Sequence, residues 1–493
     1  MSPSTTIPDL SHPATGCLIG VCGAGMKGLA ELLADRNWTL FGADSRPIAE
    51  RPPSLGRLGL RHLDETTAVK LPAVDMVLYS AAISPEHPLR QQATARNIPQ
   101  WSYPDIVAAL SRQSVTTCIA GTHGKTTTTA LTSWILQQAK QRHSLLCGGE
   151  IVGSSRNGHS SDLSGREAPL IVESCEYRRH FHQQSPATIV MTGIEWDHID
   201  CYPDAAAVTD AFLQFCRRLP PGGTLIVNAD CPLAREVSRT AARELDLRRI
   251  TFGTHEEADL QLITQRDLAW SAQFEVAVRP ENFAMFDNMA LPSASNPRTF
   301  TLPLPGRHNV HNGLAAIAAA LVEGVELDTI DSAMSRFPGV KRRLERHDLL
   351  PGVTWIDDYA HHPTAVAAVL RTIRHQFPRR PLRVYFEPHQ ESRTSAFLHE
   401  FAVALSAADE VSVLPVYRAR EIGSPPAVDA AARLVFTLRQ MGRQADLLPS
   451  LDHAAQRLET VSRPGDVVAT LGAGAIEWIP HEFSRRLPRH YAS

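Results

Sequence analysis

Seven consecutive residues near position 120 are of the types that bind phosphate, through side chains or through the backbone N–H groups of glycines. They are Gly121, Thr122, His123, Gly124, Lys125, Thr126 and Thr127. The longer phosphate-loop spacing GxxxxGK[ST] is not met, because Ile119 stands where its first glycine would be. The lysine would neutralise phosphate charge, and the Thr126 hydroxyl would ligate Mg²⁺. This stretch therefore predicts a nucleotide site with a shortened loop.

The flanking sequence predicts the elements that would position this loop. An apolar run, VTTCIAG, precedes it, and TTTTALTSWILQQA has helical spacing after it. Backbone N–H groups and the positive end of the helix dipole would then point at the phosphate oxygens. A strand, a glycine-containing loop and a helix in this order are a strong indication of phosphate binding.

Two later apolar runs carry polar residues at their ends. One run ends at Glu173, and the other ends at Ile194, shortly before Asp197 and His198. Because the carboxyl ends of parallel strands meet at one edge of a sheet, these side chains should lie near the phosphate loop. A carboxylate suits Mg²⁺, whereas a histidine suits it less, and a lone histidine after a strand more often has a capping or core role.

A second glycine cluster lies near the amino terminus. Gly23, Gly25 and Gly28 fit the pattern GxGxxG between an apolar run and a helical pattern, and the next apolar run ends at Asp44. This is a βαβ pattern in which glycines would let a pyrophosphate approach the helix amides. Taken alone, the motif fits a dinucleotide site and a tight turn without a ligand equally well. Ser80 and Ser84, which end a further apolar run, would also suit a phosphate.

The remaining candidates follow predicted strands or begin predicted helices. His308, Asn309 and Asn312 lie on the first turns of a helix of small residues, where asparagine either reads an adenine edge or caps the helix. Further along, polar clusters flank two more predicted strands, GVTWIDDYA and LRVYFEP; they contain Arg342, Arg343, Asp357, Asp358, His361, His362, His389 and Arg393. Clusters that each follow a strand favour one shared cleft.

Bulk composition limits the alternatives. A chain of 493 residues predicts two to four domains, and the alternation of strands and helices predicts three α/β blocks at 1–112, 113–333 and 334–493. A net charge of −3 gives no electrostatic basis for nucleic-acid binding. Eight scattered cysteines, none in a CxxC pair, predict reduced thiols. No secretion signal and no membrane span are apparent, so a cytoplasmic protein is expected.

Several motifs occur together in a specific order. They are GTHGKTTTT, the strand ending at Glu173, DHID, PGRHNVHN, GVKRRLE, DDYAHHPT and EPHQESRT. As a set they resemble the Mur ligase family, above all its alanine-adding members, over residues 17–480. The resemblance implies a Rossmann-like first domain, a central ATPase domain of the phosphate-loop type and a Rossmann-like third domain.

The resemblance also implies an activity. ATP and Mg²⁺ would convert the lactyl carboxylate of UDP-N-acetylmuramate into an acyl phosphate, which the amino group of L-alanine attacks. It implies catalytic roles for Lys125, Glu173, His198, Arg343 and His361, and magnesium ligands at Thr126, Glu173 and His198. ATP would contact the phosphate loop (Gly121–Thr127), and it would also contact Asn309, Asn312, Arg343 and Asp358. The UDP-sugar would contact Gly23, Ala24, Gly25, Met26, Gly28, Asp44, Ser80 and Ser84. The amino acid would contact His389 and Arg393.

The sequence departs from the family pattern at five positions. They are Cys22, Gly193, Gln390, Glu391 and Ala475. A carboxylate at 391 would repel a bound amino-acid carboxylate if it faces the pocket. Two alternatives therefore stay open: a ligase for another amino acid or a murein peptide, and a non-catalytic nucleotide-binding protein. The second is disfavoured because Lys125, Thr126, Glu173 and His198 are all present. The oligomeric state is left open.

Overall fold

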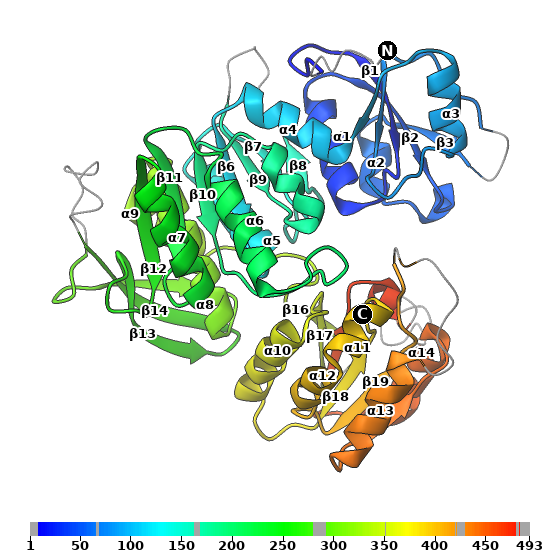
Figure 1. The fold of residues 1–493 in the computed structure, drawn as a ribbon. Helices are drawn as coiled ribbons and strands as arrows, with labels where there is room; N and C mark the ends of the chain where they lie inside the picture. Colours follow the sequence, from blue (N-terminus) through cyan, green and yellow to red (C-terminus); the bar gives the residue numbers. More distant parts are fainter. Residues whose placement is uncertain are drawn as a thin grey trace.

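Three sheets, formed by consecutive stretches of the chain, organise the molecule (Figure 1). The computed structural model describes residues 8–65, 69–161, 168–279, 292–350, 352–419, 421, 429–479 and 483. Helices pack on each sheet, so the three α/β units that the sequence predicted are confirmed. We call them the N-terminal, central and C-terminal domains.

The N-terminal domain contains a parallel five-stranded sheet in the order β3-β2-β1-β4-β5. The predicted βαβ unit forms, with its glycine turn between β1 and α1. The strands are β1 (Thr15–Ile19), β2 (Thr39–Asp44), β3 (Arg61–Asp64), β4 (Met76–Tyr79) and β5 (Gln100–Ser102). The helices are α1 (Ala24–Asp35), η1 (Ile48–Glu50), α2 (Pro53–Arg57), α3 (Pro88–Ala95) and α4 (Tyr103–Gln113).

The central domain contains a ten-stranded sheet in the order β15-β14-β13-β12-β11-β10-β6-β9-β7-β8. Its parallel middle strands are β6 (Thr116–Ala120), β7 (Ser144–Leu146), β9 (Leu170–Glu173), β10 (Thr188–Met191), β11 (Gly223–Asn228) and β12 (Leu247–Gly253). The strands β6 and β10 are buried along their whole length, because helices cover both faces of a parallel sheet.

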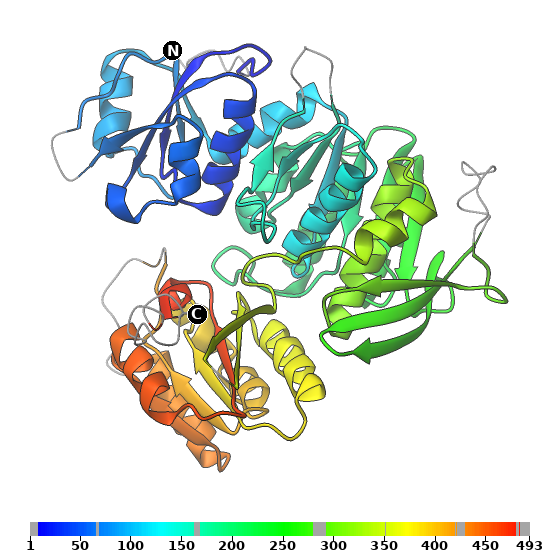
Figure 2. The same ribbon diagram turned by 180° about the vertical axis from the view of Figure 1, so that it is seen from behind.

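Additional strands extend this sheet at both ends. They are β8 (Gly158–His159), β13 (Leu260–Leu268), β14 (Ser271–Val278) and β15 (Arg298–Leu302). The antiparallel pairing of β13, β14 and β15 was not predicted from the sequence. The helices are α5 (Lys125–Gln138), η2 (Tyr177–Gln183), α6 (Ala205–Cys216), α7 (Pro232–Glu244), α8 (Arg307–Val322) and α9 (Leu327–Met334). Figure 2 shows α5 and α8 together on one face, where they share a hydrophobic core.

The C-terminal domain contains a six-stranded sheet in the order β16-β17-β21-β18-β19-β20. All pairs are parallel except that of β16 and β17. The strands are β16 (Glu345–Leu350), β17 (Val353–Asp358), β18 (Leu382–Phe386), β19 (Glu410–Val413), β20 (Gln444–Leu447) and β21 (Val467–Leu471). The helices are α10 (Pro363–Gln376), α11 (Glu391–Ala396), α12 (Leu398–Leu405), α13 (Ala430–Gln440), α14 (Leu451–Val461) and η5 (Ala475–Glu477).

Helix α1 joins the N-terminal domain tightly to the central domain. Glu31, which is fully buried, accepts hydrogen bonds from the backbone N–H groups of Asn157 and Gly158 at 2.6 and 2.9 Å. Lys27 forms an ion pair with Glu150 at 2.7 Å. The backbones approach so closely that a Cβ on Gly158 would lie 2.1 Å from the carbonyl oxygen of Gly28. Charged groups at this depth need partners, and here each finds one across the domain boundary.

Two predictions from composition can be compared with the structure. All eight cysteines are unpaired, which agrees with the predicted reduced thiols. Among the described residues, no helix combines the length and the apolar character needed to cross a membrane.

Candidate functional site

The phosphate loop has the predicted form, with β6 before it and α5 after it. Gly124 ends the loop at φ 81°, in the left-handed region that favours glycine. A Cβ at Gly124 would lie 2.2 Å from the Oδ1 atom of Asn312, so α8 approaches the loop directly. Asn312, proposed from the sequence for nucleotide binding, therefore lies next to the loop.

The Lys125 side chain is held in a buried ion pair. Its Nζ atom donates to both carboxylate oxygens of Glu176 at 2.9 and 3.0 Å, and to the carbonyl oxygens of Gly121 and Thr122. Glu176 is only 2% exposed. Burial would raise the pKa of this carboxyl, but the Lys125 ammonium outweighs that effect and holds the pKa below its ordinary value. Glu176 is therefore an anion, and in the structure it neutralises the Lys125 ammonium.

Glu176 was missed by the sequence analysis. It lies three residues beyond Glu173, after the same strand β9. A second carboxylate so soon after the end of the same strand could have predicted a second acidic residue near the phosphate loop. Glu173 satisfied the expected need for a metal ligand, so the second acid received no role.

Thr126 and Glu173 lie together, as the sequence predicted. The Thr126 hydroxyl donates to Glu173 Oε1 at 2.9 Å, and the Gly148 N–H donates to Glu173 Oε2 at 2.6 Å. Arg343 reaches across from the C-terminal domain, and its Nη2 atom donates to the Thr126 hydroxyl at 3.2 Å. The pair thus presents two oxygen donors beside the loop, with a guanidinium from a second domain next to them.

His198 contacts Glu176, the partner of Lys125, and not the oxygen pair of Thr126 and Glu173. Its Nε2 atom is 3.5 Å from Glu176 Oε1, and its ring packs edge-on against Tyr177. The backbone at His198 is left-handed, with φ 52°. The predicted proximity to the phosphate loop is therefore achieved through Glu176 rather than through Glu173.

The glycine turn of the N-terminal domain serves packing as well as backbone shape. A Cβ at Gly25 would lie 2.9 Å from the ring of Tyr103, and one at Gly28 would lie 3.2 Å from Asn157 Cβ. Gly23 and Ala24 stand at the start of α1, whereas Met26 is buried in the hydrophobic core. The spacing GxGxxG is therefore explained in part by contact between domains.

The predicted polar residues of this region make local contacts. Asp44 accepts hydrogen bonds from the N–H groups of Cys22 at 2.8 Å and Arg46 at 3.0 Å. The Ser80 N–H donates to the Ile19 carbonyl, and the Ser84 side chain is hydrogen-bonded to Glu86. Asp44 is the last residue of β2 and Ser80 directly follows β4, so both lie at the carboxyl ends of strands beside the glycine turn. The contact of these residues with a UDP-sugar stays a prediction.

The residues predicted to contact adenine or ribose are engaged within the protein. Asn309 donates from Nδ2 to the Pro305 carbonyl at 2.9 Å. Asp358 accepts hydrogen bonds from the N–H groups of Leu344 and Ala360 at 2.7 and 2.8 Å, and burial raises its pKa to about 6. Asp358 thus braces the turn that carries Arg343, which gives it an indirect connection to the phosphate loop.

Arg393 spans the boundary between the central and C-terminal domains. It is 1% exposed, and its Nε and Nη2 atoms donate to Asp197 Oδ1 at 2.9 and 2.7 Å. Its Nη1 atom donates to His389 Nδ1 at 3.0 Å, and the His361 ring packs against that of His389. Burial would raise the pKa of Asp197, but the Arg393 charge holds it far below its ordinary value. Burial lowers the pKa of His361 well below its usual range, so this ring is neutral.

The departures from the family pattern fall into two groups. The Gly193 carbonyl accepts the Thr122 N–H, and Ala475 begins η5; both act through the backbone. Gln390 is 7% exposed and left-handed, with φ 68°. Glu391 turns toward α13, where its Oε1 atom accepts the Ala430 N–H at 2.8 Å. The Glu391 carboxylate thus has a partner on α13, and its repulsion of a bound amino acid stays a prediction that depends on where the pocket lies.

We expect Glu391→Ala to lower stability without changing the KM for the amino-acid substrate. The variant removes a side-chain cap from α13, which typically costs about 1 kcal/mol. Thermal unfolding measures the first effect, and the KM for the amino acid that the resemblance implies measures the second. Glu400→Ala, on α12, is the matched control for loss of a carboxylate. A large change in the KM of Glu391→Ala would show that residue 391 faces the pocket after all.

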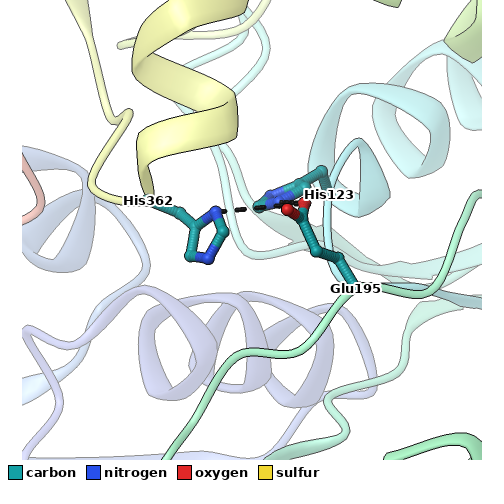
Figure 3. Close-up of side chains that lie close together, drawn as sticks. All are labelled: His123, Glu195 and His362. Atoms are coloured by element: carbon teal, nitrogen blue, oxygen red, sulfur yellow. Dashed lines mark hydrogen bonds and ion pairs between the residues drawn. The ribbon is translucent and has the colours of Figure 1, made fainter. Parts of the chain in front are cut away.

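His123, a further residue of the loop with a functional prediction, turns toward Glu195 (Figure 3). Its Nε2 atom lies 2.9 Å from Glu195 Oε2. The backbone around Glu195 is fixed to the loop, because the Glu195 N–H donates to the Thr122 hydroxyl and the same hydroxyl donates to the Glu195 carbonyl. The segment after β10 and the phosphate loop thus behave as one structural unit.

Comparison with known families gives three matches along the chain. The model described as "Mur ligase family, catalytic domain" matches residues 18–114. The Mur ligase middle domain matches residues 119–320, and the "Mur ligase, glutamate ligase domain" matches residues 342–474.

Individual relatives match over almost their whole length. A UDP-N-acetylmuramate–L-alanine ligase of Chloroflexus aggregans is 36% identical over 463 residues, which are 93% of this chain and 95% of that protein. The protein of the same name from Salinibacter ruber is 32% identical and covers 97% of this chain and 95% of its own length.

Two crystal structures show the same fold. The UDP-N-acetylmuramate–alanine ligase of Thermotoga maritima superposes with a TM-score of 0.78 at 23% identity, covering 97% of this chain and 100% of that one. A murein peptide ligase of Psychrobacter arcticus gives a TM-score of 0.70 at 22% identity, covering 96% and 99%.

Proposed function

The chain belongs to the Mur ligase family, and from that premise we propose that it joins L-alanine to UDP-N-acetylmuramate at the expense of ATP, in peptidoglycan biosynthesis. The observation that carries this proposal is the near-complete alignment with alanine-adding ligases at 32–36% identity. The arrangement of Lys125, Thr126, Glu173 and Arg343 around one loop supports it. Use of ATP and unpaired cysteines both suit the cytoplasm, which we propose as its compartment.

The reaction must bring two anions together. An oxygen of the lactyl carboxylate attacks the γ-phosphorus of ATP, ADP leaves, and an acyl phosphate forms. The neutral amine of alanine then attacks the acyl carbon, and phosphate leaves as the amide bond forms. Lys125 supplies positive charge at the loop, and Arg343 brings a second cation beside Thr126. Preorganised charges of this kind stabilise the transition state strongly in a site that excludes water.

Binding of ATP requires Lys125 to exchange partners. In the structure its ammonium is neutralised by Glu176, which is itself buried. A phosphate arriving at the loop takes the place of that carboxylate at the lysine, and His198, 3.5 Å from Glu176, can then balance the released charge. We propose that Glu176 then pairs with His198 in place of Lys125.

Magnesium fits the oxygen donors beside the loop. We propose that the Thr126 hydroxyl and the Glu173 carboxylate would hold Mg²⁺, because both are hard oxygen ligands and they lie 2.9 Å apart. Bound there, the ion would neutralise charge on the phosphates of ATP. His198 fits less well, since its ring nitrogen faces Glu176.

We expect Glu173→Ala to raise the Mg²⁺ concentration needed for half-maximal activity by about tenfold or more, and His198→Ala to raise it less. The oxygen ligand contributes more than the imidazole to binding a hard cation. Phosphate release measured across a Mg²⁺ titration tests this. Glu244→Ala, which removes a partly exposed carboxylate paired with Arg217, is the control. Identical titrations for the wild type and both variants would remove Glu173 and His198 from the metal site.

The alanine carboxylate requires a cation, and Arg393 with His389 is the group that we propose for it. The contacts of Arg393 with Asp197 and His389 use three of its five N–H groups, so two can bind a carboxylate. Since Arg393 is 1% exposed, the C-terminal domain must move before the amino acid can enter.

The proposed function is tested by ATP-dependent phosphate release with UDP-N-acetylmuramate and a panel of amino acids and murein peptides. We expect release with L-alanine and little with D-alanine or with the peptides. Reactions without UDP-N-acetylmuramate are the control for simple ATPase activity. Release only with a peptide would favour the recycling type of ligase, and no release with any acceptor would favour a non-catalytic protein.

A further inference from the structure

Three potential metal ligands converge where the central and C-terminal domains meet (Figure 3). Glu195 Oε2 lies 2.9 Å from His123 Nε2 and 3.9 Å from His362 Nδ1. One ligand atom from each of the three side chains lies within 4.8 Å of the other two. His123 belongs to the phosphate loop, Glu195 follows β10, and His362 immediately precedes α10.

His362 has no satisfied ring nitrogen in the part of the chain that the structure describes. Neither Nδ1 nor Nε2 has a hydrogen-bond partner there, although the residue is only 2% exposed. A polar group buried in this way is costly, and such a group in a folded protein calls for a ligand or another explanation. Burial lowers the pKa of His362 to about 4, so the ring is neutral and can offer a lone pair.

The carboxylate between the two imidazoles is held in place from outside. Glu195 Oε1 accepts a hydrogen bond from the Thr364 hydroxyl at 2.5 Å, which leaves Oε2 directed at His123 and His362. Partners of this kind orient metal-ligating carboxylates in known sites. Glu195 Oε1 is thus held by Thr364, which belongs to the same domain as His362.

We propose that His123, Glu195 and His362 form a binding site for a divalent transition-metal ion such as Zn²⁺, and that the ion links the phosphate loop to the C-terminal domain. Two imidazoles and one carboxylate are a ligand set that Zn²⁺ accepts, with its fourth position open to water. Tetrahedral ligands about 2.1 Å from an ion lie about 3.4 Å from one another, and the observed 2.9 and 3.9 Å lie on either side of that value. The ligand atoms of the two histidines also lie within 4.8 Å of each other, so the three side chains would have to draw together around the ion.

This site differs in chemistry from the oxygen pair of Thr126 and Glu173. Mg²⁺ requires hard oxygen ligands in octahedral geometry and binds imidazole poorly, whereas Zn²⁺, Co²⁺ and Ni²⁺ favour it. The two sites therefore select different ions. Because its ligands come from two domains, an ion at the histidine site would hold the central and C-terminal domains together. It would therefore oppose the domain movement by which we propose that the amino acid reaches Arg393.

Cobalt substitution tests the proposal directly. The metal-free full-length protein is titrated with Co²⁺, whose visible absorption is intense in tetrahedral sites and weak in water. We expect about one equivalent of Co²⁺ to give the tetrahedral spectrum, and Zn²⁺ to displace it. His362→Ala should weaken Co²⁺ binding by at least about tenfold. His375→Ala, which removes a histidine 65% exposed elsewhere on the C-terminal domain, should leave it unchanged.

A second variant and a measurement on the wild type guard against misfolding. Glu195→Gln keeps the side-chain shape and should also weaken Co²⁺ binding. X-ray absorption of the zinc-loaded wild type should give two imidazole nitrogens and one oxygen donor from the protein at about 2.0–2.2 Å. A wild type that binds no tetrahedral Co²⁺, or a tetrahedral spectrum that persists in His362→Ala, would overturn the proposal.

Discussion

Lys125→Ala should reduce phosphate release by about a hundred- to a thousandfold, because it removes the positive charge that we propose for stabilising the transferred phosphoryl group. Binding of UDP-N-acetylmuramate should be nearly unchanged. The proposed sugar-nucleotide residues around Gly23 lie in the N-terminal domain, whereas Lys125 begins α5 of the central domain. Steady-state phosphate release and calorimetric binding of UDP-N-acetylmuramate measure the two quantities separately.

The buried partner of Lys125 requires a control for stability. Removing the lysine takes the bidentate partner away from the buried Glu176 carboxylate and leaves His198, 3.5 Å away, beside it. Breaking a buried ion pair in this way typically costs about 3–5 kcal/mol. The double variant Lys125→Met/Glu176→Gln removes both charges and should regain much of the lost stability, but no activity. Near-normal phosphate release by Lys125→Ala would show that the loop is not the ATP site.

Arg393→Ala should raise the KM for alanine about ten- to a hundredfold, with little change in the KM for ATP. Loss of one charge-assisted hydrogen-bonding partner typically removes about 1.5–3 kcal/mol of binding. The structure adds a second expected effect, since Asp197 would be left buried without its cation. We therefore expect a loss of stability in addition to the loss of alanine affinity, measured by denaturant unfolding.

Asp197→Asn separates the two roles of Arg393. If the arginine only holds the domains together, Asp197→Asn and Arg393→Ala should have similar effects on the KM for alanine. If the arginine also binds the alanine carboxylate, as we propose, Arg393→Ala should have the larger effect. An unchanged KM for alanine in Arg393→Ala would locate the amino-acid site elsewhere and strengthen the case for a peptide ligase.

The local parts of the site were predictable from the sequence. The strand β6, the phosphate loop and the helix α5 follow one another along the chain, and their pattern is visible in one short stretch. Glu173 was placed beside Thr126 because parallel strands end at one edge, and the structure confirms that proximity. Each of these predictions depends on short-range patterns or on a general rule for parallel sheets.

Contacts between distant residues were not predictable in the same way. Arg393 and Asp197 are 196 residues apart, and their pairing depends on how two domains meet. Glu391 was suspected of facing the amino-acid pocket, but its capping partner Ala430 is 39 residues away. Gly25 and Gly28 look like ligand-binding glycines, yet each also makes room for a side chain of another element, Tyr103 or Asn157. Sequence patterns do not distinguish space for a ligand from space for a neighbour.

The close backbone contact between Gly28 and Gly158 has a consequence for inhibitor design. Because α1 is fixed to the central domain by that contact and by Glu31, the distance between the glycine turn and the phosphate loop is set by the protein. An inhibitor with one group for the glycine turn and a second group for the phosphate loop would therefore bind most tightly if a stiff connector of that length joined the two groups. A flexible connector would lose conformational freedom on binding, and a stiff one has already lost it.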